Sequence, residues 1–553
     1  MQKVPLIFGV TGHRDLREED IVKLEKSVFN ILKEYKTKYP HTEIIVISAL
    51  AEGADMLVAR IAKKLGITLH VLLPYQEEEY LNSFMNRESN EKEFLELKEY
   101  ASRFEINSCI HTYGAKKCYQ QLGEKIANDS NILLALWDGV DIGKSGGTSA
   151  IVKYQRDGVK ENRFDALDGN AIFIITTPRK SNPNVNTDFS VKKEYLGINV
   201  KGKEFEEMLK NVDNLNAQLN NAEFKDNNLL KNYMLFFEDK AQKNQTAFKL
   251  LSKIILISTA LAFVSLEIMH TMHIDNFTYG YGGFLLLAFA IYYFFMKNGK
   301  VQDDFVYSRG FAEAIRVQNA YNGAELNINV AKYYLKEQHH KFTWLKFVLT
   351  NLYYIDKEHK PFTPQYDKGN TPDDWIEGQI NYFQDALLKR NKSYERLEKI
   401  EKFFYIFGFV TLLLMFAILV GEHFNLIPHE KFYVNIGNYN IGEFLEKIGF
   451  IQVGEHHHKH LNWHILVLIS GVSLLIAAFI GEKYIKIEGY EEEIYHFNIM
   501  LNNFKEAKRA LERVEKGSNE YKKIIFDLGL KALDENSKWV VLHDKMRAKP
   551  SLD

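Results

Sequence analysis

The sequence predicts an α/β domain with a parallel sheet, followed by an all-α region that contains four transmembrane helices. In the first third of the chain, short apolar runs alternate with amphipathic helical patterns, which is typical of βαβ units. Further on, four apolar blocks each approach the roughly 20 residues that cross a hydrocarbon core about 30 Å thick. These blocks cover residues 254–269, 277–296, 403–421 and 461–481.

The composition bounds the class of protein. The chain has 553 residues, of which 46% are apolar and 26% charged, as in globular proteins. Lys and Arg number 70 against 72 Asp and Glu, so the overall charge of −2 gives no reason to expect a nucleic-acid partner. The two cysteines, Cys109 and Cys118, are too few for a disulfide framework or a Cys-rich zinc module, and they favour a reducing compartment.

Five buried strands are expected in the first 180 residues, at 4–10, 43–50, 67–73, 132–137 and 171–176. Helical spacing is expected at 18–39 and 54–65, and a further helix begins at Thr148. Ligands of such sheets bind beyond the carboxyl ends of the strands. The residues that follow each strand are therefore the candidates for a binding site.

Four successive strand ends carry residues that suit a nucleotide-like ligand. Glycines let the backbone approach a ligand closely, and the N–H groups at a helix start attract phosphate. Hydroxyl groups and Arg14 can add hydrogen bonds to phosphate, and Tyr75 or Trp137 can stack on a base. One such turn is usually only a turn, but four together predict a site. The candidates are Gly9, Thr11, Gly12, His13 and Arg14 after the first strand, Ser48, Glu52, Gly53 and Asp55 after the second, Pro74 and Tyr75 after the third, and Trp137, Asp138, Gly139, Gly146, Gly147, Thr148 and Ser149 after the fourth.

These strand ends resemble the SLOG domain. The segments that carry the resemblance are GVTGHRDL, SALAEGADMLVARIA, LLPY, ALWDG and GGTSAIV, within about residues 1–180. SLOG domains form a Rossmann-like superfamily that includes cytokinin-activating LOG hydrolases and nucleotide sensors of bacterial conflict systems. The resemblance implies a Rossmann-like fold with a nucleotide-derived signal as ligand and no cofactor.

The loop before the helix that begins at Thr148 argues against turnover. Catalytic LOG proteins carry Gly-Gly-x-Gly-Thr with a glutamate shortly after it, whereas this loop reads Gly146-Gly147-Thr148-Ser149 and the next glutamate is Glu161. A carboxylate there would stabilise a ribosyl cation. We therefore expect binding without catalysis, and no enzyme. Glu52 and Asp55 keep hydrolysis open, although a ribose-hydroxyl acceptor or a helix cap is the preferred interpretation of both.

Lys and Arg near the apolar blocks predict the orientation. They precede the first and third blocks and follow the second and fourth, whereas the connection 270–276 has none. Because cytoplasmic loops carry excess Lys and Arg, both termini are expected inside and residues 422–460 outside. Residues 1–10 do not fit a signal peptide, and a bacterial inner membrane is the expected location.

The expected organisation follows from these features. The SLOG domain covers 1–180, a linker with an amphipathic helix 181–250, the first transmembrane hairpin 251–297, a cytoplasmic helical segment 298–402, the second hairpin 403–482 and C-terminal cytoplasmic helices 483–553. The second hairpin and the terminal Glu535-x-x-x-Trp539 resemble SLATT domains, two-span effectors that accompany SLOG genes. His456–His458 and His460 could bind zinc, but a solvated loop is expected and no metal is predicted.

The leading functional hypothesis is a membrane effector of bacterial antiviral defence. The resemblance implies that its SLOG domain binds a nucleotide second messenger, a cyclic ADP-ribose isomer or a cyclic oligonucleotide, and triggers pore opening or membrane disruption in abortive infection. A partner enzyme with a TIR domain or a nucleotidyltransferase would make the signal. The bilayer and further copies in a homo-oligomer are the other partners, and no nucleic acid is expected. Two alternatives stay open: a membrane-tethered LOG-like nucleotide N-glycosidase, and an ion channel without nucleotide gating.

Overall fold

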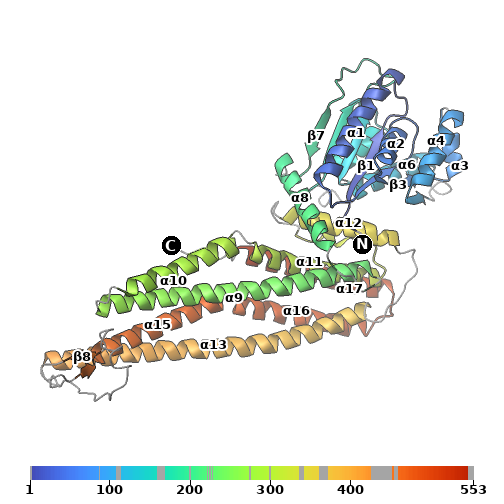
Figure 1. Ribbon diagram of the computed structural model, residues 1–553. Helices are drawn as coiled ribbons and strands as arrows, with labels where there is room; N and C mark the ends of the chain where they lie inside the picture. The colour runs from blue at the N-terminus through green and yellow to red at the C-terminus, as the bar shows by residue number, and fades with distance from the viewer. Residues whose placement is uncertain are drawn as a thin grey trace. The chain divides into compact units, whose positions relative to one another are not determined.

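The computed structural model divides the chain into two compact units (Figure 1). The α/β unit comprises Met1–Phe236 and Glu313–Tyr366, and the helical unit comprises Phe237–Ala312 and Asp367–Asp553. The structure describes residues 3–85, 87–107, 114–158, 169–197, 201–220, 222, 226, 228–272, 276–297, 300–335, 342–359, 371–424, 451–453, 459–461 and 463–545.

A seven-stranded sheet forms the centre of the α/β unit, in the order β4-β3-β2-β1-β5-β6-β7. Its strands are β1 (Leu6–Gly12), β2 (Ile44–Ser48), β3 (Thr68–Leu73), β4 (Arg103–Ile106), β5 (Ile132–Trp137), β6 (Ala171–Thr176) and β7 (Val191–Tyr195). All neighbours are parallel except β6 and β7. After β1, the chain adds β2, β3 and β4 in turn toward one edge of the sheet. After β5, it adds β6 and β7 toward the opposite edge. The loops after β1 and β5 therefore diverge, which opens space for a ligand.

The five predicted strands are confirmed, and two further strands complete the sheet. β4 is short and only half-buried along its length, so it lacks an apolar run. β7 reads VKKEY and lies at an edge, where charged residues are tolerated. Because β7 pairs with β6, the sheet continues beyond residue 180, where the sequence places the end of the domain.

Helices cover both faces of the sheet. On one face, Tyr35 of α1 packs edge-on against Phe8 of β1, with ring centroids 5.6 Å apart. On the other face, a Cβ at Gly9 would lie 3.0 Å from Ile126 of α6, so glycine allows that helix to pack closely. The elements are η1 (Glu18–Asp20), α1 (Ile21–Lys38), α2 (Ala54–Lys64), α3 (Glu77–Asn82), α4 (Arg87–Tyr100), α6 (Ala115–Asp129) and α7 (Thr148–Asp157).

Two more helices close the amino ends of the central strands. They are α8 (Gly202–Leu219) and α12 (Thr343–His359), with η3 (Val330–Lys332) before α12. Asn216 of α8 accepts a hydrogen bond from Val4 N at 3.0 Å and donates to Val4 O at 2.9 Å. The amphipathic helix expected within 181–250 is confirmed as α8, and its apolar stripe is buried in its own unit. Part of the expected cytoplasmic segment 298–402 thus belongs to the α/β unit.

The helical unit contains four helices that are long and apolar enough to cross a membrane, in agreement with the four predicted spans. Its elements are α9 (Leu229–Met272), α10 (Phe277–Ile291) with η2 (Tyr292–Lys297), α11 (Val301–Gly323), α13 (Pro372–His423), α15 (Trp463–Glu488), α16 (Tyr490–Leu511) and α17 (Asn519–Lys545), with the antiparallel pair β8 (Ile451–Val453) and β9 (Lys459–Leu461). The first turns of α9 and the last turns of α11 belong to the α/β unit.

The apolar surface of α13 faces outward. Phe403, Ile406, Phe409 and Phe416 are each more than half exposed, which is unfavourable in water and favourable in lipid. Inward, Gly408 and Gly471 meet so closely that a Cβ at Gly408 would lie 3.1 Å from the Gly471 carbonyl oxygen. Such small-residue contacts are typical of helix packing in membranes. His456–His458 and most of the loop 422–460 lie outside the described residues.

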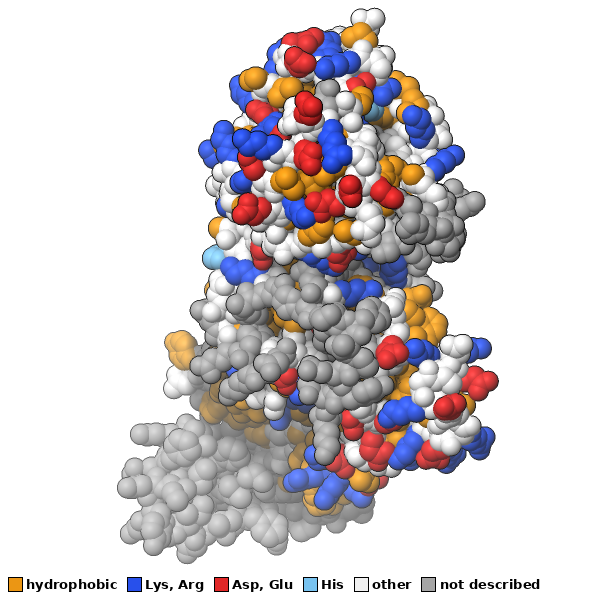
Figure 2. Space-filling view, turned by 90° about the vertical axis from the view of Figure 1, so that its right-hand side faces the viewer, with side chains coloured by type: hydrophobic (Ala, Val, Ile, Leu, Met, Phe, Trp, Pro, Cys, Tyr) orange, Lys and Arg blue, Asp and Glu red, His pale blue; other side chains and the backbone are white. Residues whose placement is uncertain are grey.

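The predicted C-terminal helices are confirmed as α16 and α17, which are separated by a short connection that contains Gly517 and Ser518. On the α/β unit, in the upper part of Figure 2, Lys and Arg side chains alternate with Asp and Glu. The described part of that face therefore does not present the single-sign field that attracts a polyanion.

Candidate functional site

A cavity of about 670 Å³ lies at the carboxyl ends of β1 and β5. Its walls come from the loops after β1, β2, β5 and β6 and from helices α3, α6 and α7. The structure brings together a large part of the predicted set here. The predicted residues that line the cavity are Thr11, Gly12, His13, Arg14, Asp55, Trp137, Gly146, Gly147, Thr148 and Ser149.

Other predicted residues shape the cavity without lining it. Ser48 donates from Oγ to Asp55 O at 3.2 Å and accepts from Leu50 N at 3.1 Å, which fixes the loop after β2. Gly53 has φ +86°, and a Cβ there would lie 2.5 Å from Arg14 O, so only glycine lets α2 begin beside Arg14. Glu52 accepts from Met85 N at 2.8 Å and anchors the segment after α3.

The remaining predicted residues lie apart from the cavity wall. Gly9 serves the packing of α6. Tyr75 contacts the wall only indirectly, because its hydroxyl lies 2.8 Å from that of Tyr119, which does line the cavity. Pro74, Asp138 and Gly139 are not among the lining residues. Tyr75 therefore supports the cavity wall through Tyr119, whereas Tyr80, in the helix after the third strand, lines the cavity itself.

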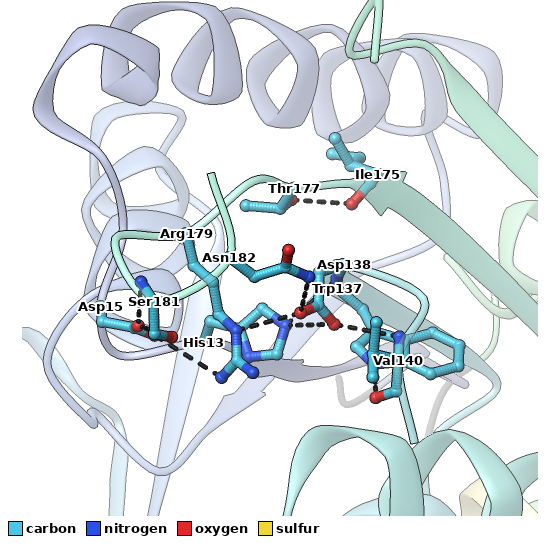
Figure 3. Close-up of polar contacts among 10 residues, drawn as sticks. All are labelled: His13, Asp15, Trp137, Asp138, Val140, Ile175, Thr177, Arg179, Ser181 and Asn182. Atoms are coloured by element: carbon cyan, nitrogen blue, oxygen red, sulfur yellow. Dashed lines mark hydrogen bonds and ion pairs between the residues drawn. The ribbon is translucent and has the colours of Figure 1, made fainter. Parts of the chain in front are cut away.

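Asp138 joins the ends of three strands at one rim of the cavity (Figure 3). Its carboxylate lies 3.1 Å from His13 Nε2 and 3.0 Å from Arg179 Nε, and it accepts a hydrogen bond from Asn182 Nδ2 at 3.0 Å. Burial raises the pKa of Asp138, but the bonds from Asn182 and Val140 N and the neighbouring charges outweigh it and lower the pKa. The ionised carboxylate of Asp138 thus fixes Arg179, and the backbone N–H of Asp138 holds His13; both side chains line the cavity.

His13 is the histidine of this network. Burial lowers its pKa below the usual value, although Asp138 acts in the opposite direction. Asp138 N also lies 3.1 Å from His13 Nε2 as a donor. The imidazole is therefore neutral at neutral pH and offers a hydrogen-bonding group to the cavity rather than a charge.

Arg14 crosses the floor of the cavity between two aromatic rings. Its guanidinium carbon lies 5.8 Å from the centroid of Tyr80 and 5.7 Å from that of Tyr119. One terminal nitrogen donates to Tyr119 Oη at 3.1 Å, and the other donates weakly to Ser83 O at 3.3 Å. Within the described residues, no carboxylate lies within 4.0 Å of the guanidinium. These contacts fix the position of the cation, which forms no ion pair within the described part of the chain.

Asp55 is the buried acid of the cavity. Burial raises its pKa to about 7, although nearby Arg14 and the N–H groups of Ala51 and Ala49 oppose this shift. Leu50, between those two donors, adopts φ +51°, a strained backbone conformation for a leucine. The loop after β2 is thus bent around a carboxyl group that changes charge near neutral pH.

The amino terminus of α7 opens into the same cavity. Gly147 is its N-cap and supplies no side-chain hydrogen bond, and the N–H groups of Thr148 and Ser149 have no partner in the described part of the chain. A Cβ at Gly146 would lie 2.5 Å from Tyr119 Cβ, so glycine lets this loop lie directly on α6. Free N–H groups and the helix dipole make this end attractive to an anion.

The charge of the lining favours an anion, and several of its residues were not predicted. Arg14, Arg179, Lys116 and Lys144 line the cavity with only Asp15 and Asp55 as acids. Arg179 follows β6, so the strand-end argument applied to the fifth strand would have found it. Tyr80 follows the third strand, whereas Lys116 and Tyr119 come from α6, where no sequence pattern marks them.

No known family model matches this chain, and no curated protein shows significant sequence similarity to it. The functional assignment therefore rests on the geometry of the cavity and on the apolar helices.

Proposed function

We propose that this protein is a membrane-embedded sensor whose cavity binds a nucleotide-derived signal and whose four apolar helices respond to it. The observation that carries the proposal is the presence, in one chain, of an anion-attracting cavity at the β1–β5 switch and of four membrane-length helices. The response is the opening of a pore or the disruption of the bilayer.

The cavity has the parts that a nucleotide needs. The uncapped amino terminus of α7 suits a phosphate, and Trp137, Val140 and Ile142 supply apolar surface for a base. Val140 and Ile142 are 45% and 46% exposed, so a ligand at this rim would cover them. A volume of about 670 Å³ lies within the usual range of small-molecule sites, about 300–1,000 Å³.

The connections of the chain supply a route from the cavity to the spans. α8 precedes α9, the helix with the first span, and α12 precedes α13, the helix with the third. Buried asparagines of α8 and α12 bind the amino end of β1, whose carboxyl end carries Gly12 and leads to Arg14. A ligand that shifts β1 would therefore act on both hairpins.

The wider context of the proposal rests on the SLOG and SLATT resemblances and on the Lys and Arg distribution. They support a Rossmann-like SLOG sensor in a bacterial inner membrane with both termini inside. They also support a homo-oligomer activated by a cyclic ADP-ribose isomer or a cyclic oligonucleotide from a partner enzyme, in antiviral defence.

One observation favours the N-glycosidase as a second candidate. Asp55 lines the cavity with a pKa of about 7, and buried acids with raised pKa values are common among catalytic groups. Glu52 gives no such support, because both of its oxygens accept hydrogen bonds from the segment after α3. Turnover of the bound nucleotide is what separates the two candidates.

The test uses the full chain in lipid nanodiscs and a thermal-shift panel of cyclic ADP-ribose isomers, cyclic di- and trinucleotides, ADP-ribose, NAD and nucleoside monophosphates. We expect one class to raise the melting temperature by several degrees, and Gly147→Asp to abolish the shift. Gly378→Asp in α13 is the control, because it places the same group in open space. Binding of no nucleotide would contradict the proposal, and product formation from the bound one would favour the glycosidase.

A further inference from the structure

The fully buried Tyr80 lines the cavity, and its hydroxyl group has no hydrogen-bond partner among the residues that the structure describes. Its ring is held in place by aromatic contacts with Tyr75 and Phe84, at centroid distances of 5.7 and 5.3 Å. An unpaired buried hydroxyl costs stability unless a ligand supplies the missing partner. The packing therefore positions a donor that the described chain itself does not use.

The guanidinium carbon of Arg14 lies 5.8 Å from the centroid of the Tyr80 ring, and no carboxylate of the described residues forms an ion pair with it. It contacts the rings of Tyr80 and Tyr119, and the neighbouring Asp55 has its pKa raised by burial, so it provides little compensating charge below pH 7. A half-buried cation next to an unpaired hydroxyl donor is a recognisable site for one anionic group.

This site is separate from the amino terminus of α7. Tyr119 joins the two: its Cβ lies against Gly146, and its hydroxyl accepts a hydrogen bond from Arg14 at 3.1 Å. Arg14 and the Gly146 loop therefore lie at opposite ends of one tyrosine side chain. A phosphate bound to the N–H groups of Thr148 and Ser149 leaves the Arg14 site open for a second anion.

We propose that Arg14, Tyr80 and Tyr119 form a second anion subsite, so that the ligand is a nucleotide with two phosphate groups rather than a nucleoside or a monophosphate. This inference rests on the proposed function and assigns separate groups of the protein to two phosphates of its ligand. Arg14 and the Tyr80 hydroxyl bind one phosphate, Tyr119 holds Arg14 in position, and the α7 terminus binds the other phosphate.

The test measures the affinity of the full chain in nanodiscs for AMP, ADP and cyclic di-AMP by calorimetry. Tyr80→Phe keeps the ring and removes only the unpaired hydroxyl. We expect it to weaken a two-phosphate probe about tenfold or more, as loss of a hydrogen bond to a charged group does, and to leave the weak binding of AMP unchanged. Tyr100→Phe is the control, since that hydroxyl donates to Ile67 O at 2.9 Å, away from the cavity lining.

The melting temperature without ligand gives a second readout. Because the Tyr80 hydroxyl is unpaired, Tyr80→Phe should not lower it. A lower melting temperature of the unliganded variant, or an equal loss of affinity for AMP and the two-phosphate probes, would overturn the second subsite while leaving nucleotide binding intact. Failure of the unmodified protein to bind any of the probes would overturn this inference, and failure on the wider panel as well would overturn the proposed function.

Discussion

Asn351 of α12 and Asn131 at the start of β5 exchange two side-chain hydrogen bonds, each 3.1 Å long, although they are 220 residues apart in the chain. Asn351 also donates to Pro5 O at 2.8 Å, and Asn131 accepts from Ile7 N at 2.9 Å. Both side chains are buried. The helix that precedes the second hairpin is thus bonded to the two strands that lead to the cavity.

Asn351→Leu should therefore separate ligand binding from the membrane response. The substitution removes the side-chain hydrogen bonds to Pro5 O and to Asn131 Nδ2, at a cost of about 1–3 kcal/mol for each buried group left unpaired, whereas Asn131 Oδ1 keeps its bond from Ile7 N. We expect a lower melting temperature of the α/β unit, nucleotide affinity within a few-fold of wild type, and a weakened release of dye from liposomes. Asn498→Leu, at an exposed position of α16, is the matched control. Equal dye release by Asn351→Leu and wild type would contradict the coupling.

A fragment that ends at residue 185 should fold poorly. It would lack β7, α8 and α12, which leaves β6 as an unpaired edge and removes the partners of Val4 and Asn131. Unpaired apolar edges promote aggregation. Size exclusion and circular dichroism of residues 1–185 should show aggregation or a melting temperature well below that of the α/β unit in the full chain. A cooperative transition at the same temperature would show that the sheet needs none of these elements.

Two features that this fragment lacks, β7 and the attachment of α12 to the sheet, could not be predicted from the sequence. The alternation of apolar runs and helices identified five strands, because each of those strands is buried along most of its length. β7 has no apolar run, because it lies at the edge of the sheet, where it pairs with β6 alone and where its charged side chains are tolerated. The attachment of α12 to the sheet depends on two buried asparagines at distant positions, and no periodicity reveals such a contact.

The same limit applies to the cavity. The features that depend on the backbone were predictable: Gly12, Gly146, Gly147 and the start of α7 follow from strand ends and helix-start chemistry. Tyr119 was not, because its role depends on the packing of α6 beside the Gly146 loop. Asp138 was predicted as a ligand contact; it does not line the cavity, and its carboxylate lies beside His13 and Arg179, which do.

Ligand affinity should depend on pH through Asp55. Its folded pKa of about 7 lies above the ordinary value of 3.8, so the carboxyl is mainly neutral at pH 6 and mainly charged at pH 8. A negative charge beside Arg14 opposes an anionic ligand, and the affinity for cyclic di-AMP, whose phosphates do not titrate in this range, should fall as pH rises from 6 to 8. Asp55→Asn should remove this dependence even if it changes the affinity itself. An affinity that is constant across this range in the wild type would refute the prediction.

The contact between α13 and α15 should be needed for the response but not for binding. At Gly471, even an added Cβ would lie 2.9 Å from Leu412 and 3.4 Å from Gly408 O. The larger side chain of Gly471→Leu therefore forces the two helices apart. Overpacking of this kind typically costs about 1–3 kcal/mol. We expect altered dye release with unchanged nucleotide affinity. Gly282→Leu in α10, where a Cβ meets open space, is the control and should behave as wild type.

The most direct test of the account combines binding and response in one preparation. Full-length protein is reconstituted into dye-loaded liposomes, and release is followed while the nucleotide that raises the melting temperature is added, for wild type and Gly147→Asp. The account predicts release by the wild type at concentrations that match the binding curve, and none by Gly147→Asp. Nucleotide binding without any change in release, or equal release by both proteins, would contradict the claim that the cavity controls the apolar helices.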